Sequence, residues 1–227
     1  MYLFKKWSDS LLGFEQVNRT VLKKSILEII IAIVGAITFI LTAYYKMAAG
    51  KGLFMLNPCH ISLLGVIVLC VAPSTARMHK LHTMWTSWLF GAFLALFFPH
   101  LRGISDFEVY LYFLEHLLII PIGPIILFRR YDFVKPNFKN QFAAFASLGI
   151  YQCSVLFFFS VLTSVNLNFA LCHSPSDPFF AIFGKWYFPF AIFYLNFGSW
   201  MSRWVLYLMV YPLRLIRKKI HEGSSKD

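Results

Sequence analysis

Long apolar runs, separated by short polar segments, dominate this chain. A helix needs about 20 residues to cross a hydrocarbon core about 30 Å thick. We predict membrane-spanning helices at residues 26–45, 53–72, 81–98, 109–128, 142–162 and 186–213. The pattern therefore predicts an all-α polytopic membrane protein, a bundle of about six transmembrane helices.

The last apolar run differs from the others. It is longer than one span needs, and it carries Asn196 and Arg203. It also follows the stretch "HSPSDPFFAIFGKW", in which Pro and Gly interrupt regular structure. A re-entrant or tilted entry into the membrane is therefore plausible for this segment.

Composition supports the membrane assignment. The 227 residues are 59% hydrophobic and 14% charged, and the mean hydropathy is +0.65, which is too apolar for an ordinary soluble domain. The formal charge of +11 comes from basic residues at the ends of apolar runs. A nucleic-acid-binding face would instead interleave them with aromatic residues, so we expect no nucleic acid partner.

The distribution of Lys and Arg predicts the orientation. Of the 21 basic residues, 16 fall on one side of the predicted membrane and four on the other. The positive-inside rule then places both termini in the cytosol. We divide the chain into an N-terminal interfacial segment (1–24), a transmembrane catalytic domain (25–213) and a basic cytosolic tail (214–227). We expect an integral membrane protein of the endoplasmic reticulum or another endomembrane.

The stretch "LNPCHISLLGV" places reactive groups at the head of an apolar run. Asn57 is a favoured N-cap and Pro58 suits the first helical position, so Cys59 should lie in the first turn of a helix. The free N–H groups and the positive dipole end would favour a thiolate there. The same amides could hold the oxyanion of a tetrahedral intermediate.

A histidine lies at a similar depth on another predicted span. Counted at 1.5 Å per residue, Cys59 stands about 21 Å, and His116 about 18 Å, above the inner ends of their spans. An ionisable residue inside a membrane is a functional-site hypothesis by default. Cys59 and His116 are therefore candidates for a nucleophile and its general base.

Simpler interpretations remain open for these residues. A buried Cys is often only a small hydrophobe. His116 could be a core histidine, helped by Tyr112 one turn away. His60 is better explained as capping the helix end or facing lipid headgroups than as the base, because adjacent helical residues point apart.

Three longer motifs bring a resemblance to a known family. "LNPCH", "FEVYLYFLEH" and "SVNLNFALCHSPSDPF" follow one another in the order and approximate spacing of the transmembrane protein 164 family. The match extends from about residue 22 to the C-terminus. The family has an additional N-terminal transmembrane helix, so we expect this chain to be a shorter relative or isoform.

The resemblance implies a cysteine-dependent phospholipid acyltransferase, a transacylase that needs no cofactor. It would move polyunsaturated acyl groups onto ether-linked lysophosphatidylethanolamine, a plasmalogen-type acceptor, through an acyl-cysteine. The family nucleophile falls on Cys59 and its catalytic histidine on His116. The family's core is similar to the androgen-induced and androgen-dependent membrane hydrolases. Gln152 and Glu115 depart from it, since they stand where a histidine and a glutamine are expected.

The resemblance also implies a substrate-binding set, with membrane phospholipids and lysophospholipids as partners. Part of it lies in the loop after the fifth span, which would shape the headgroup end of a cavity, although turn chemistry is the simpler explanation of Asn and Asp there and the one we favour. The predicted substrate-binding residues are Asn57, His60, Tyr112, Asn166, Asn168 and Asp177.

Other chemistry is not indicated. No Cys/His spacing fits a structural zinc site and no Gly-rich phosphate loop follows a strand, so we expect neither a metal nor a nucleotide. Cys172 could form a disulfide with Cys59 in an oxidising lumen, which would remove the nucleophile. The alternatives to acyl transfer are lipid ester hydrolysis and a non-catalytic transporter or scaffold.

Overall fold

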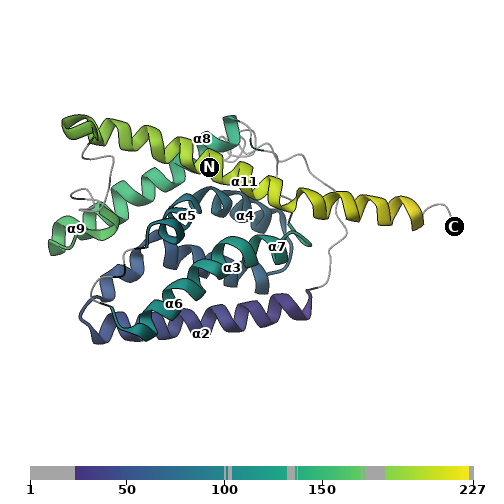
Figure 1. Cartoon of the computed structure of the whole chain (residues 1–227), viewed down its shortest axis with the longest axis horizontal. Coiled ribbons are helices and arrows are strands. Elements are labelled where there is room, and N and C mark those ends of the chain that lie inside the picture. The colour runs from purple at the N-terminus through teal and green to yellow at the C-terminus, as the bar shows by residue number, and fades with distance from the viewer. Residues whose placement is uncertain are drawn as a thin grey trace.

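The computed structural model describes residues 24–99, 101, 104–131, 136, 138–169, 171 and 182–224. Most of these residues lie in helices. No strand occurs among these residues. Figure 1 shows helix α2 along one side of the molecule and the long helix α11 along the opposite side, with α3 to α7 between them. The predicted all-α class is therefore confirmed.

Helix α2 (Ile26–Ala48) is the first predicted span. It begins with a capping box, in which the Ser25 hydroxyl accepts from the Glu28 amide and the Glu28 carboxylate accepts from the Ser25 amide. Three of its isoleucines, Ile26, Ile33 and Ile40, are more than half exposed. Such a face is suited to contact with lipid.

The second predicted span is shorter than expected. A 3₁₀ turn, η1 (Gly52–Leu56), precedes helix α3 (Pro58–Val71). Asn57 is the N-cap and Pro58 occupies the first turn, as predicted. The Asn57 side chain, however, makes no capping hydrogen bond.

The third predicted span divides into two helices, α4 (Ala76–Trp88) and α5 (Phe90–Phe97). The hydroxyl groups of Thr86 and Ser87 both donate to the carbonyl oxygen of Thr83 near the division. Hydroxyl groups that bond back to carbonyls of the preceding turn often bend helices. The apolar pattern does not show this break.

The fourth predicted span is one continuous rod with a widened turn in its middle. Helix α6 (Asp106–Leu117) leads through a π-helical turn, η2 (Leu118–Ile122), into α7 (Gly123–Leu127). Pro121 lies inside the widened turn, where its missing N–H accounts for the change of hydrogen-bond register. The region still spans 22 residues.

The C-terminal third consists of α8 (Phe138–Ile150), the π-helical turn η3 (Tyr151–Leu156), α9 (Phe157–Thr163) and the 3₁₀ turn η4 (Leu167–Phe169). After it come η5 (Gly184–Trp186) and the 38-residue α11 (Tyr187–Ser224). The boundary predicted at residue 213 falls inside α11. The predicted re-entrant entry lies largely at residues 172–181, outside the described residues.

Three helices in the described part are long and apolar enough to cross a membrane: 26–48, 106–127 and 145–163. Helix α3 is apolar but shorter. A polytopic membrane protein agrees with these helices. The six-span count and the cytosolic termini stay predictions.

Helices α2, α3 and α6–α7 pack together around a core that includes Leu63, Leu69 and Ile119. Two glycines permit close packing on α3. A Cβ at Gly65 would stand 2.7 Å from the Trp85 ring, and one at Gly35 would stand 3.1 Å from Ile67. Glycine is therefore needed where Trp85 of α4 rests on α3.

A buried ion pair joins these helices at one end. The Arg130 guanidinium, just after α7, donates to the carbonyl oxygens of Leu69, Cys70 and Ala72 at the end of α3. Its Nε lies 2.8 Å from Oε2 of Glu28, which is fully buried. Arg130 thus satisfies the last carbonyls of one helix and neutralises a buried carboxylate of another.

Candidate active site

A cavity of about 160 Å³ lies at the other end of the same helices, between α2, η1, α3 and α6. Both residues that the sequence predicts as catalytic, Cys59 and His116, line it. Three of the predicted substrate-binding residues, Asn57, His60 and Tyr112, line it as well. The structure therefore brings together residues that lie on two separate predicted spans.

Cys59 sits in the first turn of α3 as a free thiol, partly buried. Pro58 has no N–H, and the N–H groups of His60 and Ile61 donate to the Asn57 carbonyl at 3.1 and 3.3 Å. Among the amides described in this first turn, that of Cys59 is left for an oxyanion. The helix start offers fewer free donors than the sequence suggested. Cys172, which could form a disulfide with Cys59, lies outside the described residues.

His116 is held in one orientation and one tautomer. Its Nδ1 lies 2.7 Å from the carbonyl oxygen of Tyr112, which can only accept, so Nδ1 carries the proton. The Tyr112 hydroxyl in turn donates to the carbonyl oxygen of Ala95 at 2.6 Å. The His116 Nε2 atom is buried with no hydrogen-bond partner, and the residue is only 1% exposed.

Such an arrangement suits a general base. In neutral imidazole with a proton on Nδ1, the lone pair is on Nε2. An unpaired buried acceptor is costly, and in native proteins it calls for an explanation such as a catalytic role.

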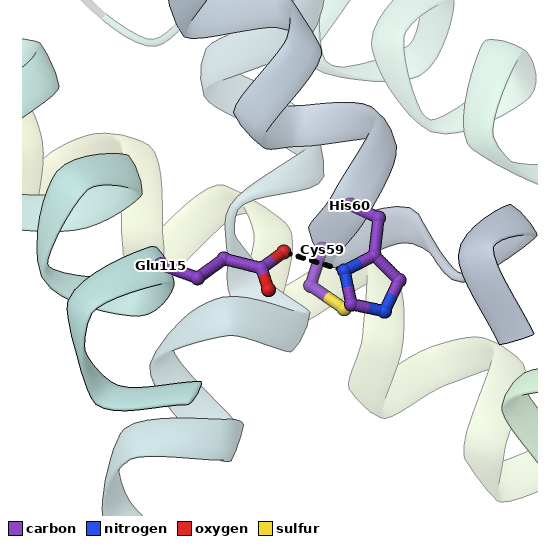
Figure 2. A group of neighbouring side chains, drawn as sticks. All are labelled: Cys59, His60 and Glu115. Carbon is purple, nitrogen blue, oxygen red and sulfur yellow. Dashed lines mark hydrogen bonds and ion pairs between the residues drawn. The ribbon is translucent and has the colours of Figure 1, made fainter. Parts of the chain in front are cut away.

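His60 does not cap the helix or face the headgroups. It is 6% exposed, and its Nδ1 donates to Oε1 of Glu115 at 2.7 Å. Figure 2 shows the Glu115 side chain reaching from its helix toward His60, with Cys59 beside the imidazole ring. The expectation for His60 was therefore wrong. Adjacent residues of a helix point in different directions, but Cys59 and His60 both border the cavity, because it lies at the start of the helix.

The sulfur of Cys59, a ring nitrogen of His60 and a carboxylate oxygen of Glu115 all lie within 4.8 Å of one another. The carboxylate opposes a second negative charge on the neighbouring sulfur in this buried setting. The thiolate that the helix start alone would favour is therefore opposed by Glu115. Proton removal from Cys59 needs a base close by.

A second charged pair lies along the same cavity. The Lys46 Nζ of α2 is 3.9 Å from Glu108 Oε1 of α6, and both side chains are about one-fifth exposed. Glu108 also caps α6 through Ser105. The pair gives the cavity one cationic and one anionic group near its exposed side, which the sequence did not reveal.

An apolar groove adjoins the cavity between α2 and α6. Its volume is about 260 Å³, and its lining includes Ile37, Tyr110 and Leu114. Leu111 lines both the groove and the cavity. Hydrocarbon can therefore reach the edge of the polar cavity from the exposed face of the helix pair.

Two further predicted residues, Asn166 and Asn168, lie outside the cavity. Asn168 exchanges hydrogen bonds with Gln152, one from each side-chain amide, at 3.0 and 3.3 Å. Asn166 Oδ1 accepts from the Leu171 amide, which is turn chemistry. Neither Asn lines the cavity, although η4 packs against η1, which borders it. Asp177 lies outside the described residues.

Sequence reasoning missed the two charged pairs at the cavity. His60 and Glu115 are 55 positions apart, and in the sequence Glu115 stands out only as a departure from the family pattern. The one available signal was that Glu115 and Glu108 are acids on an otherwise apolar span.

Comparison with protein families finds a match over most of the chain. The family model described as the TMEM164 family matches residues 3–212. No solved structure matches the chain.

Proposed function

The chain belongs to the TMEM164 family, and from this premise we propose that it is a membrane enzyme that transfers a fatty acyl group between phospholipids through an acyl-cysteine. One observation carries the proposal. The free thiol of Cys59 and the unpartnered Nε2 of His116 border one cavity, beside an apolar groove.

The first half-reaction forms the acyl-enzyme. His116 Nε2 accepts the Cys59 thiol proton as the sulfur attacks the ester carbonyl of a donor phospholipid. The tetrahedral intermediate collapses, the carbon–oxygen ester bond breaks, and His116 returns the proton to the departing lysophospholipid oxygen. A thioester on Cys59 remains. Because the Glu115 carboxylate disfavours a thiolate on Cys59 before the attack, the thiol proton leaves at the same time as the sulfur attacks the ester.

The second half-reaction reverses these roles. The hydroxyl of a lysophospholipid gives its proton to His116 and attacks the thioester, and the Cys59 thiol is restored. We propose ether-linked lysophosphatidylethanolamine as the acceptor and a polyunsaturated chain as the acyl group, in keeping with the family resemblance. The endoplasmic reticulum or another endomembrane is the proposed location.

The oxyanion of each intermediate needs donors. The Cys59 amide is available in the first turn of α3. Asn57 supplies a second: its side-chain Oδ1 is buried without a hydrogen-bond partner in the same cavity, and a half-turn of the amide presents its N–H₂ group instead. Removing one such donor typically costs about 10²–10³ in rate.

The apolar groove between α2 and α6 accommodates the acyl chain. Its open side faces outward, where Ile37 is 53% and Tyr110 73% exposed. The chain can stay in hydrocarbon while the ester reaches Cys59, so no lipid has to be extracted into water.

The acyl-enzyme can be tested directly. The full chain in lipid nanodiscs receives a phospholipid with an isotopically labelled acyl chain, and mass spectrometry then searches its peptides for the label. We expect label on Cys59, released by hydroxylamine as a thioester is, and moved to added lysophosphatidylethanolamine. Cys153, an exposed free cysteine, supplies the matched control Cys153→Ala.

Cys59→Ala should abolish both the label and the transfer, while Cys153→Ala keeps them. Undiminished transfer in Cys59→Ala excludes the mechanism. Label that passes to water instead of the lysolipid identifies a hydrolase with the same nucleophile.

A further inference from the structure

Cys59, His60 and Glu115 present three different metal-ligand types to one point. A thiol sulfur, an imidazole nitrogen and a carboxylate oxygen, all within 4.8 Å of one another, are the donors that zinc prefers. Figure 2 shows the three side chains converging from two helices. From this arrangement we propose that the three residues form an inhibitory zinc site, in which the metal captures the Cys59 sulfur.

The distances suit a metal after small side-chain rotations. With bonds of about 2.0–2.3 Å in a tetrahedron, donor atoms lie roughly 3.3–3.8 Å apart. The 2.7 Å contact between His60 Nδ1 and Glu115 Oε1 must open, and any separation that is now wider than this range, at most 4.8 Å, must shorten to it. The fourth position opens into the cavity, where water or a substrate oxygen completes the shell.

Charge balance favours the ion in this buried place. Without metal, the Glu115 carboxylate opposes a thiolate on Cys59. A Zn²⁺ ion with one thiolate, one carboxylate and a neutral imidazole has no net charge, so it avoids the large cost of an isolated ion in an apolar interior. The other nearby charges, Lys46 and Glu108, already balance one another.

A second group in the cavity points to a ligand. His116 Nε2 is buried without a partner and lines the same cavity. It can accept a hydrogen bond from a zinc-bound water, because its Nδ1 is already committed to Tyr112. Water on the metal thus gives Nε2 the partner that the metal-free cavity lacks.

Zinc binding and catalysis compete for one sulfur. Binding forms zinc–sulfur, zinc–nitrogen and zinc–oxygen bonds and releases the thiol proton, and it needs an unprotonated His60 nitrogen, so it weakens as the pH falls. The sulfur lone pair is then unavailable to the ester carbonyl. The inhibition rests on the proposed acyl transfer, whereas the binding itself does not.

The local-spacing rule for zinc motifs does not detect this site. That rule finds ligands a few residues apart, whereas Glu115 is 55 positions from His60. The sequence-based expectation of no metal therefore applies only to sites whose ligands lie within one short segment.

Cobalt offers a readout that is independent of activity. The full chain in nanodiscs is titrated with Co²⁺, and the thiolate-to-cobalt charge-transfer absorption is recorded before Zn²⁺ displaces the cobalt. We expect one cobalt per chain. His60→Gln and Glu115→Gln should weaken cobalt binding by about tenfold or more, and Cys59→Ser should abolish the absorption.

Two controls separate this site from others. Cys153→Ser must keep the absorption, and so must His116→Ala, which loses acyl transfer but none of the three ligands. Zn²⁺ should inhibit transfer by the wild type, and a chelator should restore it.

Absence of the absorption in the wild type overturns the zinc site, even where acyl transfer is robust. Unchanged cobalt affinity in His60→Gln and Glu115→Gln also overturns it, since Cys59 alone then binds the metal. Absorption that depends on all three residues, in a protein that transfers no acyl group, supports the zinc site and rejects the proposed function.

Discussion

His116 Nδ1 donates to the carbonyl oxygen of Tyr112 one turn earlier in α6, at a distance of 2.7 Å. In the neutral imidazole the single N–H, on Nδ1, is used by this hydrogen bond, so the lone pair is on Nε2. It also fixes the ring against Tyr112, whose centroid lies 4.3 Å away. The buried Nε2 has no hydrogen-bond partner, and His116 lines the cavity that Cys59 also borders, so the geometry favours a catalytic interpretation.

His116→Ala should reduce acylation and deacylation alike, by roughly 10²-fold or more, because the same base serves both steps. Single-turnover experiments with labelled donor measure acylation. Chasing the acyl-enzyme with lysolipid measures deacylation. Equal rates in variant and wild type would leave His116 a structural residue.

His60→Gln provides the comparison. His60 has its Nδ1 bound to Glu115, as in a catalytic triad, so it is the rival base. With His116 as the base, we expect His60→Gln to keep more activity than His116→Ala. The opposite order would transfer the role of base to His60.

The apolar pattern predicted where helices would form, because burying hydrocarbon in lipid decides the position of long apolar runs. Helix α2 and the rod from Asp106 to Leu127 lie close to their predicted spans. The division of the third span between α4 and α5 was missed, because it involves hydroxyl groups that bond back to Thr83.

The candidate site was predictable only in part, for a similar reason. Depth counting could bring Cys59 and His116 together, since both are positions along straight helices. The pairing of His60 with Glu115 depends on how two helices rotate against one another. No single segment of sequence contains that information.

Leu114→Trp should reduce transfer of long polyunsaturated chains more than that of short saturated chains. Leu114 lines the apolar groove, so a larger side chain there removes space for hydrocarbon. Competition between two labelled donors in one nanodisc preparation measures the ratio. Leu117→Trp is the matched control, because Leu117 is similarly exposed on α6 but does not line the groove. Identical ratios in both variants would place the acyl chain elsewhere.

Arg130→Met should destabilise the protein by about 3–5 kcal/mol, the cost of leaving a buried charge unpaired. Glu28 is fully buried, and three carbonyls at the end of α3 would lose their donor as well. Unfolding in one detergent, followed by circular dichroism, compares the variants. Arg129→Met is the control.

Arg129 is 50% exposed and lies 3.9 Å from Glu28, and partly exposed pairs contribute about 0–1 kcal/mol. We therefore expect a small effect from Arg129→Met. Equal losses in the two variants would mean that burial of the ion pair is not what stabilises this end of the bundle.

Ser164→Cys should report which leaflet the cavity serves. Ser164 is exposed and ends α9 in a left-handed conformation, with φ of 58°, and cysteine nearly matches serine in size there. The following turn, η4, packs against η1 at the border of the cavity. The Lys and Arg distribution predicts that this end lies on the luminal side.

In sealed vesicles of known orientation, and with Cys153 and Cys172 replaced by Ser, a membrane-impermeant thiol reagent should label Ser164→Cys from the luminal side only. Ala76→Cys, exposed at the start of α4 beyond the opposite end of α3, should label from the cytosolic side only. Phospholipid ester groups lie just below the headgroups, so this pattern would give Cys59 access to luminal-leaflet donors. Labelling of Ser164→Cys from the cytosol would invert the predicted topology and move the proposed chemistry to the cytosolic leaflet.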